Sequence, residues 1–158
     1  MITLKKVKVS DRDLLWNINQ KYLYEMTNFY DDPMDENGNY HYGYFDEYFT
    51  DLNRVAYFIY SDKTLIGFVL LNPYSYIGQS PDYVMAEFTI FPQYRRCHYA
   101  YEAATLVLLK HPGNWEIKYN EKNRPAKSLW IKIASKYDYK TISLNNEETV
   151  LVFNTLKE

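Results

Sequence analysis

The sequence predicts one α/β domain, with about four helices on a mixed, mostly antiparallel sheet of about seven strands. Three observations predict this class. β-rich and helix-periodic runs follow the order β-α-α-β-β-β-α-β-α-β-β along the 158 residues. A strand at 83–91, a helix at 100–110 and a strand at 115–119 form a β-α-β unit, whose two strands should lie parallel. No repeat or linker divides the chain, so we treat 1–158 as one domain.

The N-terminal elements follow from hydrophobic periodicity. Residues 2–9 alternate lysine with apolar side chains, which is typical of a strand rather than of a signal peptide. Ser10 can cap a helix over 11–28, and Asp13 completes a start similar to a capping box. The apolar side chains of this helix recur at helical spacing and are Leu14, Leu15, Ile18, Tyr22, Leu23 and Met26.

The later elements follow from β-rich runs and from the turn or cap residues between them. Ser61-Asp62-Lys63 joins two such runs into a hairpin. Pro112-Gly113 ends the helix at 100–110, and Asn123 can cap a further helix with Pro125 in its first turn. The remaining expected segments are a loop at 31–42, a short helix at 44–52, strands at 54–60 and 64–71, a loop at 72–81, a helix at 123–136, and a closing hairpin of 139–144 and 149–154. The expected core includes Trp16, Phe68, Leu106 and Trp115.

Charge is distributed unevenly along the chain, whose net charge is −2. Residues 1–94 carry seven basic and thirteen acidic side chains, whereas 95–158 carry eleven basic and seven acidic ones. The acidic N-terminal part argues against nucleic-acid binding, which needs a continuous basic surface. No apolar run is long enough for a membrane span, and three dispersed histidines with one cysteine disfavour a metal site. A single cysteine also fits a reducing, cytoplasmic compartment.

The most informative segment covers residues 87–100. Glu87 interrupts an apolar strand, Pro92 follows, and Arg95 and Arg96 form a basic turn directly before a helix. A helix start presents unpaired backbone N–H groups and the positive end of the helix dipole. The sequence therefore predicts a site for an anionic, phosphate-bearing ligand with one carboxylate nearby.

Two segments, together with the order of elements, resemble the GCN5-related N-acetyltransferase (GNAT) superfamily. Residues 95–100, Arg-Arg-Cys-His-Tyr-Ala, are similar to the family's Q/R-x-x-G-x-G/A turn, and 90–94, Ile-Phe-Pro-Gln-Tyr, to the strand-Pro-x-Tyr segment before it. Residues 123–130, Asn-Arg-Pro-Ala-Lys-Ser-Leu-Trp, are similar to its N-x-x-A-x-x-L-Y helix. The resemblance covers nearly the whole chain and implies one acyl-CoA N-acyltransferase-like domain, whose parallel strand pair splays apart.

The resemblance also implies the ligands: acetyl-CoA as acyl donor, and a primary amine of a small molecule or peptide as acceptor. Backbone N–H groups of the turn would wrap the pyrophosphate, and the strand edge near Ile90 would bond the pantetheine arm as an added strand does. Asn123 would bond the same arm, and Ala126 and Trp130 would line its thiol end. The turn residues concerned are Arg95, Arg96, Cys97, His98, Tyr99 and Ala100.

Two residues depart from the family's motifs. His98 stands at the position of the first glycine in the turn motif. Three alternatives are open there: the histidine side chain narrows the approach of a phosphate, it adds a hydrogen-bond donor when protonated, or it points outward without effect. Trp130 stands where many members place a tyrosine that protonates the departing thiolate, and an indole N–H is no acid. Transfer would then need no side-chain acid, or would use another tyrosine.

Glu87 is the candidate general base, because an amine must lose a proton before it attacks and partial burial would raise the carboxyl pKa. The alternative is a surface glutamate on the polar face of the strand. The acceptor is expected at Tyr30, Asp31 and Asp32, where charge pairing and cation–π contacts suit a cationic amine. The alternative there is a flexible acidic loop whose tyrosines pack on the core.

Two other classes remain open from the sequence. One is a non-catalytic GNAT-fold binding or regulatory domain with a degenerate coenzyme loop, which His98 and Trp130 support. The other is a tyrosine-rich interaction module without coenzyme affinity. The sequence fixes neither the acceptor nor the assembly, and a homodimer is among the assemblies it allows.

Overall fold

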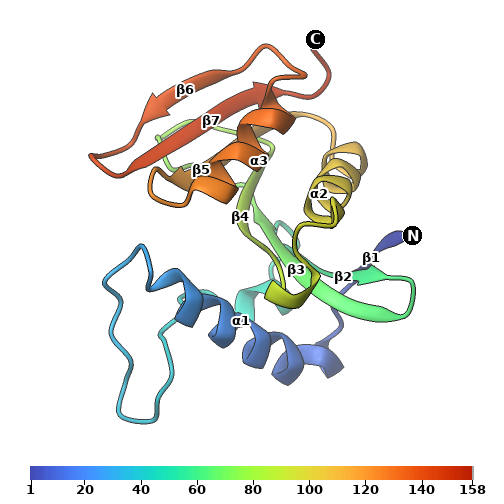
Figure 1. Ribbon diagram of the computed structural model, residues 1–158, viewed down its shortest axis with the longest axis vertical. Helices are drawn as coiled ribbons and strands as arrows, with labels where there is room; N and C mark the ends of the chain where they lie inside the picture. Colours follow the sequence, from blue (N-terminus) through green and yellow to red (C-terminus); the bar gives the residue numbers. More distant parts are fainter. Residues whose placement is uncertain (158) are drawn as a thin grey trace.

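A computed structural model describes residues 1–157, whose strands form one seven-stranded sheet (Figure 1). The strand order is β1-β2-β3-β4-β5-β7-β6, and β4 and β5 form the parallel pair among antiparallel neighbours. The strands are β1 (Ile2–Lys6), β2 (Val55–Ser61), β3 (Thr64–Asn72), β4 (Tyr83–Ile90), β5 (Asn114–Asn120), β6 (Lys140–Ser143) and β7 (Glu148–Asn154). The helices are α1 (Arg12–Met26), α2 (Tyr99–Lys110) and α3 (Arg124–Ala134), with 3-10 turns η1 (Val9–Asp11), η2 (Asp46–Phe49) and η3 (Pro92–Tyr94). This mixed sheet confirms the predicted fold class.

The segment 44–52, expected as a short helix, contains only the 3-10 turn η2. Tyr44 has a φ of 65°, a left-handed conformation that a right-handed helix does not accommodate. Phe45 and Tyr48 are buried, so the aromatic side chains of this segment pack into the core and do not form one face of a helix. The first strand ends earlier than expected, at Lys6, because η1 redirects the chain into α1.

Apolar side chains cover both faces of the sheet and form two cores. Figure 1 shows the ribbon of the sheet with its three helices. Alternation along β3 sends Val69 to the core that includes residues of α2 and α3, and Phe68 and Leu70 to the core that includes residues of α1. Trp115 and Phe68 are fully buried as expected, whereas Trp16 and Leu106 are partly buried against the cores. Within residues 1–157, no helix combines the length and apolar character that a membrane crossing requires.

The parallel pair β4 and β5 separates after three residue pairs. Tyr83 to Met85 pair with residues 115–117, and the register against β3 then shifts because Ala86 is an extra residue in β4. Such a bulge bends a strand and increases its twist. Beyond it, β4 continues along β3 to Ile90 while β5 follows β7. The facing edge of β4 from Ala86 to Ile90 therefore has no strand partner on the β5 side.

Candidate functional site

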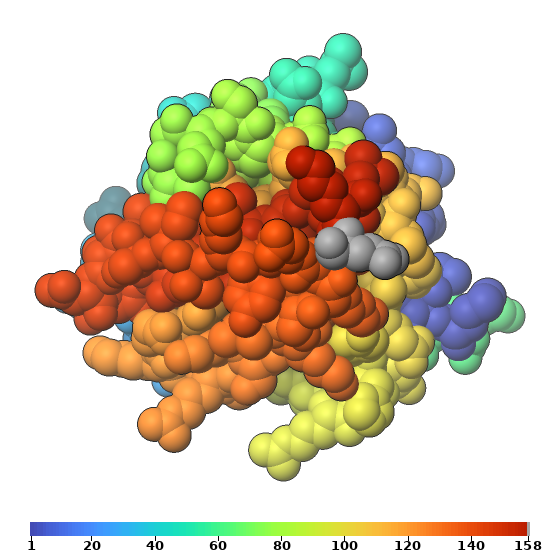
Figure 2. Space-filling model, turned by 90° about the horizontal axis from the view of Figure 1, so that it is seen from above, coloured from blue at the N-terminus to red at the C-terminus, as the bar shows by residue number. Residues whose placement is uncertain are grey.

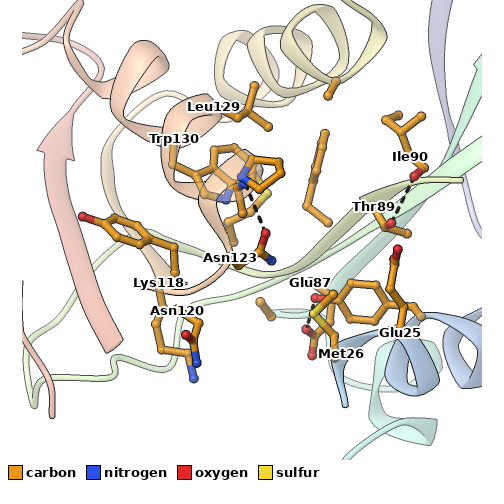
Figure 3. A pocket seen from close by; sticks show the side chains of 18 of the residues that line it. Glu25, Met26, Glu87, Thr89, Ile90, Lys118, Asn120, Asn123, Leu129 and Trp130 are labelled. Carbon is orange, nitrogen blue, oxygen red and sulfur yellow. Dashed lines mark hydrogen bonds between the residues drawn. The ribbon is translucent and has the colours of Figure 1, made fainter. Parts of the chain in front are cut away.

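A cavity of about 1140 Å³ lies where β4 and β5 separate, between α1, α3 and the turn before α2 (Figure 3). Figure 2 shows that this turn and the start of α3 stand on either side of a notch in the surface. The sequence-predicted residues that line the cavity are Tyr30, Asp32, Glu87, Ile90, Arg95, Arg96, His98, Tyr99, Ala100, Asn123, Ala126 and Trp130. Asp31 and Cys97 are exposed and do not line it.

Glu87 lies on β4 just after the bulge, half-buried in the wall of the cavity. Its Oε1 accepts a hydrogen bond from the Tyr22 hydroxyl at 3.0 Å, and its Oε2 accepts one from the Tyr42 hydroxyl at 2.7 Å. Burial raises the pKa of this carboxyl, and the two hydroxyls and the charge of Lys118 oppose the rise in part. A carboxylate with a raised pKa is a better proton acceptor than an exposed one.

The two hydroxyl donors to Glu87 are residues that sequence reasoning missed as site residues. Tyr22 was assigned to the apolar stripe of the first helix, and Tyr42 lies in the loop after it. Burial raises the pKa of both phenols, and so does the neighbouring charge of Glu87, so both keep their protons and donate. The loop is held to α1 by Gln20, whose amide bonds the Tyr40 N–H at 2.6 Å and the Tyr40 carbonyl at 2.7 Å. This anchor positions Tyr42.

The turn between β4 and α2 exposes its backbone donors. Arg96 and His98 have φ values of 64° and 63°, so both are left-handed, a conformation that favours glycine. Within residues 1–157, the backbone N–H groups of 96–100 have no hydrogen-bond partner. His98 thus adopts a backbone conformation that glycine enters without strain. The arrangement presents these backbone donors at the start of a twelve-residue helix, the kind of position where proteins bind anions.

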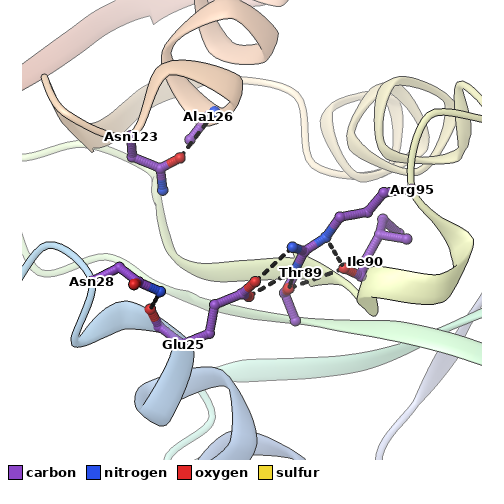
Figure 4. A network of polar contacts seen from close by, with 7 residues as sticks. All are labelled: Glu25, Asn28, Thr89, Ile90, Arg95, Asn123 and Ala126. Carbon is purple, nitrogen blue, oxygen red and sulfur yellow. Dashed lines mark hydrogen bonds and ion pairs between the residues drawn. The ribbon is translucent and has the colours of Figure 1, made fainter.

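Arg95 has protein partners at each of its side-chain nitrogens (Figure 4). Nη1 and Nη2 bond the two carboxylate oxygens of Glu25 at 2.6 and 2.7 Å, Nε bonds the Ile90 carbonyl at 2.7 Å, and Nη2 reaches the Thr89 hydroxyl at 3.3 Å. Arg96, by contrast, has no ion-pair partner within the described residues, so its guanidinium is available to an anion at the turn. Arg95 instead ties α1 to the end of β4.

The α3 side of the cavity carries the second sequence motif. Asn123 Oδ1 caps α3 by accepting from the Ala126 N–H at 3.3 Å, and its amide nitrogen has no partner within 1–157. Trp130 is 5% exposed and packs edge to face on Phe88, with ring centroids 5.1 Å apart. The indole therefore forms a wall of the cavity beside the free edge of β4.

A charged cluster from β5 and β7 closes the opposite wall. Lys118 Nζ bonds Glu148 Oε2 at 2.8 Å, and the Tyr30 hydroxyl donates to the same oxygen at 2.8 Å. Asn120 is 3% exposed, and its amide nitrogen has no partner among the described residues although it lines the cavity. Sequence reasoning missed Lys118 and Asn120, because nothing in a short alternating strand separates them from surface residues. The described residues contain no cluster of three or more His, Cys, Asp or Glu side chains that could hold a metal ion.

No family model and no curated protein matches the chain, but solved structures do. Spermidine N-acetyltransferase from Vibrio cholerae, in complex with CoA and spermine, superposes with a TM-score of 0.70 at 16% identity, over 99% of this chain and 96% of that one. PaiA N-acetyltransferase from Thermoplasma acidophilum, in complex with coenzyme A, gives 0.62 at 14% identity over 98% and 99%. A GNAT-family acetyltransferase from Bacillus cereus gives 0.64 at 16% identity over 100% and 99%. The chain has the fold of the GCN5-related N-acetyltransferases, as the sequence resemblance implied.

Proposed function

We propose that the protein is an N-acetyltransferase that moves an acetyl group from acetyl-CoA to a primary amine, with Glu87 as general base. The observation that carries the proposal is the meeting of three parts in one cavity: a carboxylate with a raised pKa, a free strand edge and a turn of unpaired amides. The solved structures with the same fold that contain CoA support this choice of donor. The single cysteine supports a cytoplasmic location for the activity.

The residues present fit the donor. The N–H groups of 96–100 would bind the pyrophosphate, and the side chain of Arg96 would add a positive charge. The Phe91 N–H bonds β3 through the Ile66 carbonyl, so strand alternation turns the amides of Phe88 and Ile90 toward the free edge, where the pantetheine arm would lie. The Asn123 amide would bond the same arm. Bound acetyl-CoA would supply an activated acyl carbonyl and a thiolate leaving group.

The chain's own residues would then perform the proton transfer and the positioning. Glu87 would take a proton from the acceptor ammonium, directly or through water, while Tyr22 and Tyr42 hold its two oxygens. The backbone N–H near Ile90 would polarise the acyl carbonyl. Trp130 would confine the thiol end, since its indole is not an acid. Alignment of the two reactants would supply much of the acceleration, up to roughly 7–11 kcal/mol.

A second candidate function is a GNAT-fold domain that binds the coenzyme without catalysis. It is favoured by Trp130 at the position of the family's acidic tyrosine, and by the strained His98 in the turn. Isothermal titration with CoA and acetyl-CoA, followed by a thiol-release screen of primary amines, separates the two. Binding with turnover supports the transferase, binding without turnover supports the second candidate, and no binding contradicts both.

A further inference from the structure

A second cavity of about 550 Å³ adjoins the first on the acceptor side of Glu87. It is lined by Tyr44, Arg54, Asn72, Tyr74, Tyr76 and Val84, and four of these residues also line the large cavity. Arg54 directly precedes β2, and Val84 lies on β4 three residues before Glu87. Because the large cavity is itself lined by both Glu87 and Arg54, it extends from the candidate base to Arg54, and the second cavity lies on the Arg54 side.

Arg54 is the cationic side chain common to both cavities, and its side chain is only 10% exposed. Its guanidinium lies over the rings of Tyr44, Tyr48 and Tyr74, at 5.0, 5.4 and 4.6 Å from their centroids. Nε bonds Asp51 at 3.2 Å, but within residues 1–157 neither terminal nitrogen has a hydrogen-bond partner. A largely buried guanidinium whose terminal nitrogens have no protein partner can complete its hydrogen bonding with a ligand oxygen.

Glu87 and Arg54 both line the large cavity, and the ring of Tyr48, which also lines it, lies beside Arg54. The charge of Glu87 raises the pKa of Tyr48 in addition to burial, whereas Arg54 lowers it. The Tyr48 hydroxyl also accepts a hydrogen bond from Asn72 at 3.2 Å, which holds the ring in place. A small molecule can therefore present an ammonium to Glu87 and an anionic group to Arg54 across a tyrosine-lined space.

We propose that the acceptor is a small amino carboxylate, with its amine at Glu87 and its carboxylate on the terminal nitrogens of Arg54. This rests on the proposed acetyl transfer. A guanidinium fork matches a carboxylate in two parallel hydrogen bonds. Asp51 already offsets part of the Arg54 charge, which favours a singly charged carboxylate over a dianionic phosphate. A polyamine would place a second ammonium against Arg54 and is disfavoured by repulsion.

The test compares pairs of acceptors that share the reacting amine and differ in whether they also carry a carboxylate. Phenylalanine is paired with 2-phenylethylamine, and 5-aminopentanoate with 1,5-diaminopentane, in a thiol-release assay with acetyl-CoA. We expect the amino carboxylate of each pair to have the higher kcat/KM, by about tenfold or more, because a charge-assisted bond contributes about 1.5–3 kcal/mol. Equal rates, or faster transfer to the amines without a carboxylate, would overturn the assignment.

Arg54→Gln tests the residue itself. We expect it to raise KM for the amino carboxylates about tenfold or more and to leave KM for the matched amines unchanged, at the same affinity for CoA. Arg12→Gln is the matched control, because Arg12 also pairs with an aspartate and lies over aromatic rings but lines neither cavity. An equal loss for all acceptors in Arg54→Gln would show a structural role and contradict the proposal. If Arg54→Gln does not fold, Arg54→Lys keeps the charge and should retain part of the preference.

The two proposals fail in different ways. Binding of acetyl-CoA without thiol release in the presence of any amine contradicts the proposed acetyl transfer. The carboxylate site is then tested by direct titration. In that case calorimetry with phenylalanine and 2-phenylethylamine, in the presence of CoA, decides whether the carboxylate is recognised. Tighter binding of phenylalanine supports the site, and equal or absent binding contradicts it.

Discussion

The two halves of the large cavity are built on different principles. On the turn side, the anion site consists of backbone N–H groups without protein partners, and the side chains around it are largely exposed. On the Glu87 side, both carboxylate oxygens have phenol donors that come from α1 and from the loop after it. Side-chain identity therefore matters less in the turn, where backbone N–H groups are the donors, than around Glu87, where both hydroxyls lower the pKa of the carboxyl group.

The largest effect is expected at the carboxylate itself. Glu87→Gln removes the base but keeps the shape, and we expect turnover to fall by about 10²–10⁴-fold while the CoA affinity measured by calorimetry stays the same. Steady-state thiol release checks the first part. Turnover that equals wild type across the pH range would exclude Glu87 as base.

The next effect is a shift in pH dependence when one phenol donor is removed. The Tyr42 hydroxyl bonds the ionised form of Glu87 and lowers its pKa, so Tyr42→Phe should raise that pKa further. The base works only when ionised, so the acidic limb of kcat/KM moves to higher pH, and activity at the acidic end falls by about fivefold or more. Tyr24→Phe on α1, whose side chain is exposed, is the control and should leave the limb in place. A limb that moves to lower pH in Tyr42→Phe would contradict the assignment.

A smaller effect separates the two arginines of the turn. Arg96→Ala should weaken CoA binding about two- to fivefold at low salt, less at high salt, and leave the melting temperature unchanged. Arg95→Ala should lower the melting temperature, because it removes the contacts to Glu25 and to the Ile90 carbonyl. Calorimetry at two salt concentrations measures the CoA affinity of each variant, and thermal unfolding measures its melting temperature. The reverse pattern would show that Arg95 is the phosphate ligand.

The smallest effect concerns the strained turn. His98→Gly should stabilise the fold by about 0.5–1 kcal/mol, because relief of the left-handed strain exceeds the entropic cost of glycine. Ala100→Gly, inside α2, should destabilise by a similar amount, about 0.5–1 kcal/mol. Urea unfolding compares the two variants. A loss of stability in His98→Gly would mean that the imidazole makes a contact more important than the strain.

Local signals in the sequence predicted the sheet and the turn, whereas the separation of β4 and β5 was implied only by the family resemblance. Period-two alternation marks β2 and β3, and Pro92 and Pro112 bound the segments around α2. Local signals also suggested a helix at 44–52, where the left-handed Tyr44 and core packing left only a 3-10 turn.

Partners that are distant in the chain were not predictable in the same way. Tyr22 and Tyr42 lie 65 and 45 residues from Glu87, and Glu25 lies 70 residues from Arg95. A tyrosine on an apolar stripe has the same sequence signal whether its hydroxyl faces solvent or a carboxylate. Only the packing of α1 on the sheet decides between the two, so the candidate base could be named from the sequence but its surroundings could not.

Because Ala86 is an extra residue in β4, the number of residues in this strand matters as well as their identity. Removing Ala86 would let Met85 and Glu87 follow each other in regular alternation along β3, and would remove the local bend that the bulge gives β4 where it leaves β5. The loop at 31–39, by contrast, is mostly exposed and can change length with little effect on the sheet. In this fold the residue count of one short strand is under as strong a constraint as any single side chain.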